Sequence, residues 1–163
     1  EIGHGFDDQG STFDGDGVMR NWWTPKDLTA FKQKTAALVA QYSALKVFPD
    51  LNVNGEFTQG ENIGDLGGLS IALKAYKMSL NGKESHVLDG FTGEQRVFLG
   101  WGQVWLNKAR EDDLRGQVAN DPHSPAKFRI NGVVRNIPEF YKAFNIKPTD
   151  SLYLAPNKRV KIW

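Results

Sequence analysis

Cysteine is absent from this chain of 163 residues, and histidine is scarce. Without cysteine there is neither a disulfide framework nor a thiolate metal site. A site that needs imidazole must draw on only three residues, His4, His86 and His123. These two shortages narrow the search for a catalytic or metal centre to a few positions.

Long apolar runs and an excess of one charge are also missing. No run approaches the roughly 18 apolar residues of a membrane span, and the N-terminus shows no charged-then-apolar signal segment. The formal net charge of +1 gives no electrostatic case for nucleic acid binding. Hydrophobic residues make up 40% and aromatic residues 12%, which is typical of a globular chain. We expect residues 1–163 to form a single domain with a real core.

Helical spacing and capping signals predict a mainly α-helical fold with little β-structure. Thr24-Pro25 is a typical helix start, and Thr92 with Gln95 forms a predicted capping box. Asn54-Gly55 predicts a turn, in a segment that resembles a short hairpin. We expect helices over 1–8, 25–45, 61–80, 93–110, 111–119 and 136–144, an extended segment over 46–58, a loop over 121–125 and an irregular tail over 151–163.

The predicted helix over 61–80 contains Gly64, Gly67 and Gly68. Each glycine disfavours a helix by about 1 kcal/mol relative to alanine. Their presence therefore indicates that another element approaches closely, and we expect this element to be the segment that contains His4.

Two short motifs carry candidate metal chemistry. Glu1 and His4 form a Glu-x-x-His pattern, and Glu61 and Asp65 form a Glu-x-x-x-Asp pattern on one helix face. A catalytic zinc ion needs three protein ligands, an open position for water and a carboxylate that takes a proton from that water. Glu-x-x-His alone is weak, because it occurs on many ordinary helices.

Further motifs support the interpretation of these residues as part of a zinc site. EIGHGFDDQG at 1–10, WW at 22–23, GENIGDLGGL at 60–69, NDPHSPAKFRI at 120–130 and the final Trp163 occur in the order found in the neprilysin family of zinc metallopeptidases. The resemblance covers essentially the whole chain. It implies a segment of a thermolysin-like (gluzincin) catalytic domain, helices packed around one Zn²⁺, and hydrolysis of oligopeptides by zinc-activated water.

The resemblance also implies roles for the residues of the two short motifs. His4 and Glu61 correspond to zinc ligands, and Glu1 corresponds to the general base. Asp65 corresponds to the carboxylate that orients a ligand imidazole. The imidazole partner of Asp65 is the first histidine of the His-Glu-x-x-His motif, which would precede Glu1, so Asp65 is expected to be unpaired in this chain.

Further along the chain, the resemblance assigns residues to the substrate. His123 corresponds to the histidine that stabilises the transition state, and Asp121 to the carboxylate that orients it. Arg129 corresponds to the arginine that binds a substrate carbonyl. Val104 and Trp105 correspond to the pocket for the side chain after the cut bond, which implies cleavage before large hydrophobic residues.

Each of these side chains also has an ordinary structural role open to it. His4 can end a helix, Glu61 can favour a helix N-terminus, and Arg129 can form a surface ion pair. Asp65 can be a solvated helix residue, and Asp121 a turn residue beside an exposed His123. Val104 and Trp105 can be core residues.

The chain as given supplies two of the three zinc ligands, so we expect little or no activity from it alone. An upstream part of the parent chain would complete the site, and the resemblance implies an extracellular or periplasmic parent. The family's closing arginine is replaced by Lys161, which lacks the bidentate fork. The alternative is a non-catalytic binding or scaffold domain that keeps the fold without a complete zinc site.

Overall fold

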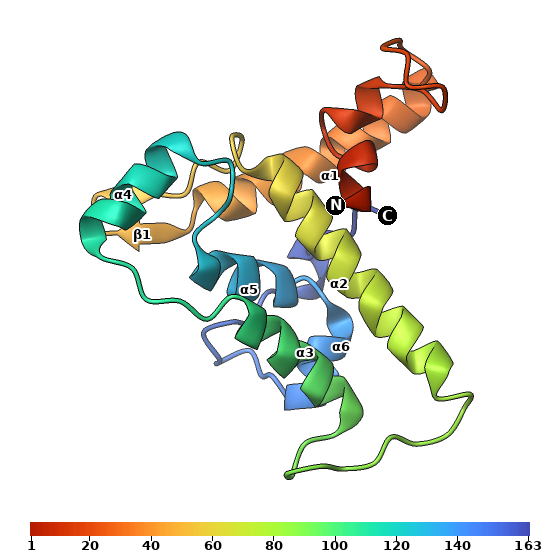
Figure 1. Ribbon diagram of the computed structural model, residues 1–163, viewed down its shortest axis with the longest axis vertical. Coiled ribbons are helices and arrows are strands. Elements are labelled where there is room, and N and C mark those ends of the chain that lie inside the picture. Colours follow the sequence, from red (N-terminus) through yellow and green to blue (C-terminus); the bar gives the residue numbers. More distant parts are fainter.

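The computed structural model describes residues 1–163, and α-helices are its main elements (Figure 1). This confirms the mainly helical fold. The only sheet is a small antiparallel hairpin. The elements are η1 (Ile2–Phe6), η2 (Gly10–Thr12), α1 (Pro25–Ser43), β1 (Lys46–Phe48), β2 (Leu51–Asn52), α2 (Gln59–Ser79), α3 (Gly93–Val104), α4 (Glu111–Asn120), α5 (Ala126–Val134), α6 (Pro138–Phe144) and η3 (Pro156–Lys158).

Helix α1 begins where its capping signal predicts. The Thr24 side chain accepts a hydrogen bond from the backbone N–H of Asp27, and Pro25 occupies the first turn. Phe31, Leu38 and Tyr42 form its buried face. Their helical spacing carries this face into the core.

Helix α2 is the longest helix, and it runs through the molecule between η1 and the α3–α5–α6 group (Figure 1). Its buried residues include Ile63, Leu66, Leu69 and Leu73. The η1 segment contacts it at the glycines, because a Cβ atom added at Gly3 would lie 3.2 Å from Gly64 Cα. The expected approach of the His4 segment to α2 is therefore found, but it is Gly3 that makes room for it. A Cβ at Gly64 or Gly68 would meet nothing within 4 Å, and one at Gly67 would meet only Trp163.

The hairpin is real, but its turn is not the predicted one. Strands β1 and β2 are joined at 49–50, ahead of Asn54-Gly55. Asn54-Gly55 does begin a turn, in which Asn54 accepts the backbone N–H groups of Phe57 and Thr58, but this turn leads from β2 into α2. Gly55 lies against α1, where an added Cβ would be only 2.3 Å from the Val39 carbonyl oxygen.

Three predicted boundaries differ from the structure. Helix α3 has the expected Thr92–Gln95 capping box but ends at Val104. Helix α6 begins at Pro138, because the buried side chain of Asn136 bonds to Gln41 and to the backbone of Val160 and does not act as a cap. The segment 1–8 forms 3-10 turns, not the end of an α-helix.

Helix α5 was not expected. The prolines at 122 and 125 predict a loop, and they do form one, but Pro125 is also the residue from which α5 starts. Helix α5 matters for the site because it carries Arg129.

The two chain ends lie close together (Figure 1). The Trp163 ring stacks on Phe31 of α1 with ring centroids 5.5 Å apart, and it meets Phe6 of η1 edge-on at 6.0 Å. The C-terminal residue therefore packs between η1 and α1. None of the helices combines the length and the apolar character that crossing a membrane requires.

Candidate functional site

The Glu61 carboxylate lies at the centre of the predicted site, in the first turn of α2. Its Oε1 lies 3.1 Å from His4 Nε2. Its Oε2 lies 3.3 Å from His123 Nε2 and 3.2 Å from Arg129 Nη2. One carboxylate thus joins residues that come from η1, α2, the 121–125 loop and α5.

Asp7 contacts the His4 imidazole at Nδ1, the ring nitrogen that does not face Glu61. Its Oδ2 lies 2.8 Å from His4 Nδ1, and its Oδ1 accepts the backbone N–H groups of Gln9 and Gly10 at 2.8 Å each. The hydrogen bond to Asp7 raises the pKa of His4 against the opposing effect of burial. A carboxylate on Nδ1 places the proton there, so that Nε2 faces Glu61.

Asp7 was missed from the sequence, where it lies in the predicted helix over 1–8 and has no assigned role. The signal that could have found it is its position three residues after His4, which brings both side chains to one side of a helical turn. It is buried, whereas a loop aspartate is normally solvated.

His123 is oriented in a similar way by Asp121. Asp121 Oδ1 lies 2.5 Å from His123 Nδ1 and accepts the His123 backbone N–H at 2.9 Å. The backbone hydrogen bond and then the side-chain hydrogen bond lower the pKa of Asp121, so this carboxyl stays ionised. The predicted Asp121–His123 pair is therefore formed, with Nε2 directed at Glu61.

Asp65 does not lie unpaired, contrary to expectation. Both of its carboxylate oxygens accept from Arg129, at 2.7 Å from Nε and 2.7 Å from Nη2. The guanidinium also lies over the Trp105 ring, 3.8 Å from its centroid. Burial lowers the pKa of Arg129, but the hydrogen bonds and charge of Asp65 outweigh burial and raise it. Arg129 is thus a fixed cation, oriented by an acid and an aromatic face.

A cavity of about 200 Å³ opens beside these groups. Glu1, Gly64, Gly68 and Trp101 help to line it. The lining also includes His4, Glu61, Asp65 and Arg129. The predicted general base and both predicted zinc ligands therefore border one cavity.

Val104 and Trp105, the two residues predicted to line the pocket for the side chain after the cut bond, lie in different surroundings. The side chain of Val104 is exposed and does not line this cavity, so the core role considered for it is wrong. Trp105 is partly buried and supports Arg129. Trp101 of α3 donates its indole N–H to the Arg129 carbonyl oxygen at 3.1 Å.

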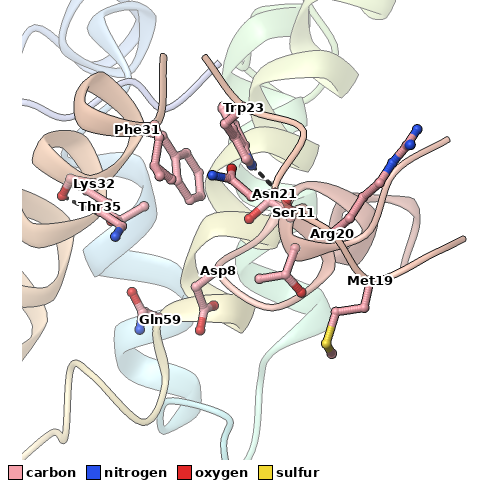
Figure 2. A pocket seen from close by; sticks show the side chains of 12 residues that line it. Asp8, Ser11, Met19, Arg20, Asn21, Trp23, Phe31, Lys32, Thr35 and Gln59 are labelled. Atoms are coloured by element: carbon pink, nitrogen blue, oxygen red, sulfur yellow. Dashed lines mark hydrogen bonds between the residues drawn. The ribbon is translucent and has the colours of Figure 1, made fainter. Parts of the chain in front are cut away.

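A larger cavity, of about 490 Å³, lies away from the site (Figure 2). Trp23 and Phe31 form its aromatic side, and Asp8, Arg20 and Lys32 supply its charged groups. Burial raises the pKa of Asp8, whose Oδ1 has no hydrogen-bond partner. None of the predicted site residues lines this cavity.

Part of a zinc-ligand set is present at the site. Two atoms that are each 2.0–2.1 Å from one tetrahedral ion lie about 3.3 Å apart. The His4 Nε2–Glu61 Oε1 separation of 3.1 Å is close to this value, and the neutral tautomer that carries its proton on Nδ1, toward Asp7, would have a lone pair on Nε2 for the metal. These two residues fit a zinc ion. No three histidine or acidic side chains of the chain form a group that could hold a metal ion by themselves.

The sequence pattern of Peptidase family M13 matches residues 1–160. Neprilysin-1 of Caenorhabditis elegans is 40% identical over 169 aligned residues, which cover 100% of this chain and 22% of that protein. Endothelin-converting enzyme 1 of Homo sapiens is 40% identical over 167 residues, covering 100% of this chain and 21% of that protein. The chain thus spans about a fifth of the length of these relatives.

Solved structures agree with the sequence comparisons. Zinc metalloprotease Zmp1 of Mycobacterium tuberculosis, in complex with an inhibitor, superimposes with a TM-score of 0.97 at 54% identity, covering 100% of this chain and 26% of that one. PepO of Lactobacillus rhamnosis superimposes with a TM-score of 0.84 at 35% identity, covering 100% and 24%. Sequence match and fold together place this chain in the M13 family of zinc metallopeptidases.

Proposed function

We propose that these residues form part of the catalytic centre of a zinc-dependent endopeptidase that hydrolyses oligopeptides. The observation that carries the proposal is the sharing of one carboxylate, Glu61, between His4 on one side and His123 with Arg129 on the other. This arrangement places candidate metal ligands next to candidate substrate-binding donors.

In this proposal, His4 Nε2 and Glu61 hold the zinc ion, and Asp7 orients the imidazole. Zinc supplies a Lewis acid that polarises the scissile carbonyl and makes water a stronger nucleophile. A catalytic zinc site uses three protein ligands, so a third ligand must come from outside these 163 residues. The 163-residue chain alone is accordingly proposed to bind zinc weakly and to be nearly inactive.

Glu1 is proposed as the general base. Its position on the cavity that His4 and Glu61 also line supports this role. The carboxylate would take a proton from the attacking water and deliver it to the leaving amine.

His123 and Arg129 are proposed to bind the reacting peptide. His123 Nε2 would donate to the developing oxyanion, with Asp121 holding the ring in place. Arg129 has Nε and Nη2 engaged by Asp65, which leaves Nη1 to donate to a substrate carbonyl.

The preference for cleavage before a large hydrophobic residue is likewise a proposal. Trp105 offers an aromatic surface beside Arg129, and Val104 offers an exposed apolar one. The partners in this proposal are a peptide substrate and the remainder of a longer parent chain. The location proposed for that parent is extracellular or periplasmic.

The test is peptide hydrolysis by a longer protein that contains these residues and a complete zinc site. We expect cleavage that a chelator abolishes and added zinc restores. Replacing the ligand by Glu61→Gln should lower kcat/KM by at least about 10³-fold, whereas the matched change His86→Gln, in a loop away from the site, should leave it unchanged. Unaltered activity in Glu61→Gln would reject Glu61 as a zinc ligand. Absence of zinc-dependent cleavage in the wild type would favour the alternative, a scaffold that retains the fold without the chemistry.

A further inference from the structure

Two fully buried polar residues lie directly beside the site, and none of the roles above includes them. Asn62 follows Glu61 in α2 and is 1% exposed, and Ser124 follows His123 and is 0% exposed. The Ser124 hydroxyl donates to Asn62 Oδ1 at 2.8 Å. The two residues are 62 positions apart in the chain, so this bond joins two segments that nothing local brings together.

The orientation of the Asn62 amide is well defined. Its Nδ2 donates to the Thr58 hydroxyl at 3.0 Å, and that hydroxyl donates to the Asn54 carbonyl at 2.9 Å. Ser124, Asn62 and Thr58 therefore form a buried network that ends at the exposed Asn54, and each buried hydroxyl and amide in it has a partner. Such networks hold one geometry because any rearrangement leaves a polar group unpaired away from water.

The 121–125 loop has few other links to α2. Asp121 bonds within the loop, and Gln117 of α4 donates to the His123 carbonyl at 3.2 Å. The remaining ion pair between the loop and α2 is the His123–Glu61 contact itself. That contact is exposed on one side, since the His123 side chain is 43% accessible.

We propose that Asn62 and Ser124 are positioning residues, whose hydrogen bond fixes His123 relative to Glu61. This rests on the proposed function, because it assigns the pair to the geometry of that catalytic centre. Neither residue touches the reacting atoms. Each is bonded through one peptide link to a residue that does, so a shift of the pair moves the functional side chains by a comparable amount.

The kinetic consequence follows from where His123 acts. A donor that is used in the transition state loses its effect when it is displaced by as little as about 1 Å, which can cost on the order of 100-fold in rate. Ser124→Ala should therefore lower kcat by about 10- to 100-fold and change KM by less than about threefold. Ser124→Cys, which retains a weak donor, should recover part of the loss.

The first experiment measures kcat and KM in the longer zinc-containing protein. In a His123→Ala background, Ser124→Ala should have less than about a twofold further effect on kcat, because both changes remove the same interaction. Ser70→Ala is the matched control: it removes a hydroxyl that bonds to the Leu66 carbonyl on the same helix and should change nothing. Full kcat in a stably folded Ser124→Ala protein, or losses that multiply in the double variant, would overturn the proposal.

A second experiment does not depend on activity. The chain contains only three histidines, so the ring ¹H–¹³C signals of His123 can be followed by NMR at one fixed pH, with His86 as the internal reference. The His123 signals should shift or broaden in Ser124→Ala and Asn62→Ala but not in Ser70→Ala. Unchanged His123 signals would reject the positioning role. Absence of peptidase activity in the wild type would instead reject the proposed function.

Discussion

Asp65 binds Arg129 through both carboxylate oxygens at 2.7 Å, although 64 residues separate them. The Asp65 side chain is 8% and the Arg129 side chain 11% accessible. This buried pair fixes the guanidinium in one plane, and Trp105 covers one face of it. A substrate carbonyl would therefore meet a donor that is already in place, which lowers the entropy cost of binding.

Removing the acid should destabilise the protein. Asp65→Asn removes the two-oxygen anionic partner of a buried guanidinium and leaves it only the Glu61 contact at 3.2 Å, so we expect the free energy of unfolding to fall by about 3 kcal/mol in urea denaturation. The matched change Asp113→Asn, in the exposed pair with Arg110, should cost less than about 1 kcal/mol. Equal losses of unfolding free energy in both variants would mean that the buried Asp65–Arg129 pair stabilises the protein no more than the exposed Asp113–Arg110 pair.

Changing the carboxylate behind His4 should weaken zinc binding. Asp7→Asn offers an amide N–H to Nδ1, which forces the His4 proton toward Nε2 and removes the lone pair that faces Glu61. We expect the zinc dissociation constant of the longer protein to rise by about 10- to 100-fold in chelator competition. Asp16→Asn, in an exposed turn, is the control, and an unchanged dissociation constant in Asp7→Asn would contradict the account.

Asp8 should make stability depend on pH. Burial raises its pKa in the folded state, so the ionised carboxylate disfavours folding, and this penalty appears as pH rises through the ordinary carboxyl range to the raised value. Asp8→Asn is neutral at every pH. It should melt at a higher temperature than wild type at pH 7, and the difference should shrink as pH falls toward 4. A lower melting temperature for Asp8→Asn at pH 7 would show that the charge is stabilised by a partner.

Much of the architecture could be predicted because it depends on local chemistry. The Thr24 cap, the Thr92–Gln95 capping box and the spacing of Glu61 and Asp65 are properties of short segments, and each is where it was expected. His4, Glu61, His123 and Arg129, which come from separate sequence motifs, also converge on one place.

The errors concern features that depend on distant partners. The pairing of Asp65 with Arg129 joins α2 to α5. Helix α5 itself was not predicted, because the prolines at 122 and 125 indicated a loop. Asn136 has the local signature of a helix cap, but tertiary bonds to Gln41 and Val160 take its side chain. Val104 has helical spacing with core residues, yet α3 ends there and its side chain is exposed.

A crystal structure of the longer zinc-loaded protein would decide whether His4 and Glu61 are ligands of one zinc ion. Anomalous difference maps recorded on either side of the zinc absorption edge identify the metal and its position. We expect one peak about 2.0–2.1 Å from His4 Nε2 and about 2.0–2.2 Å from a Glu61 oxygen. A zinc peak bound elsewhere, with the His4–Glu61 contact intact and empty, would contradict it.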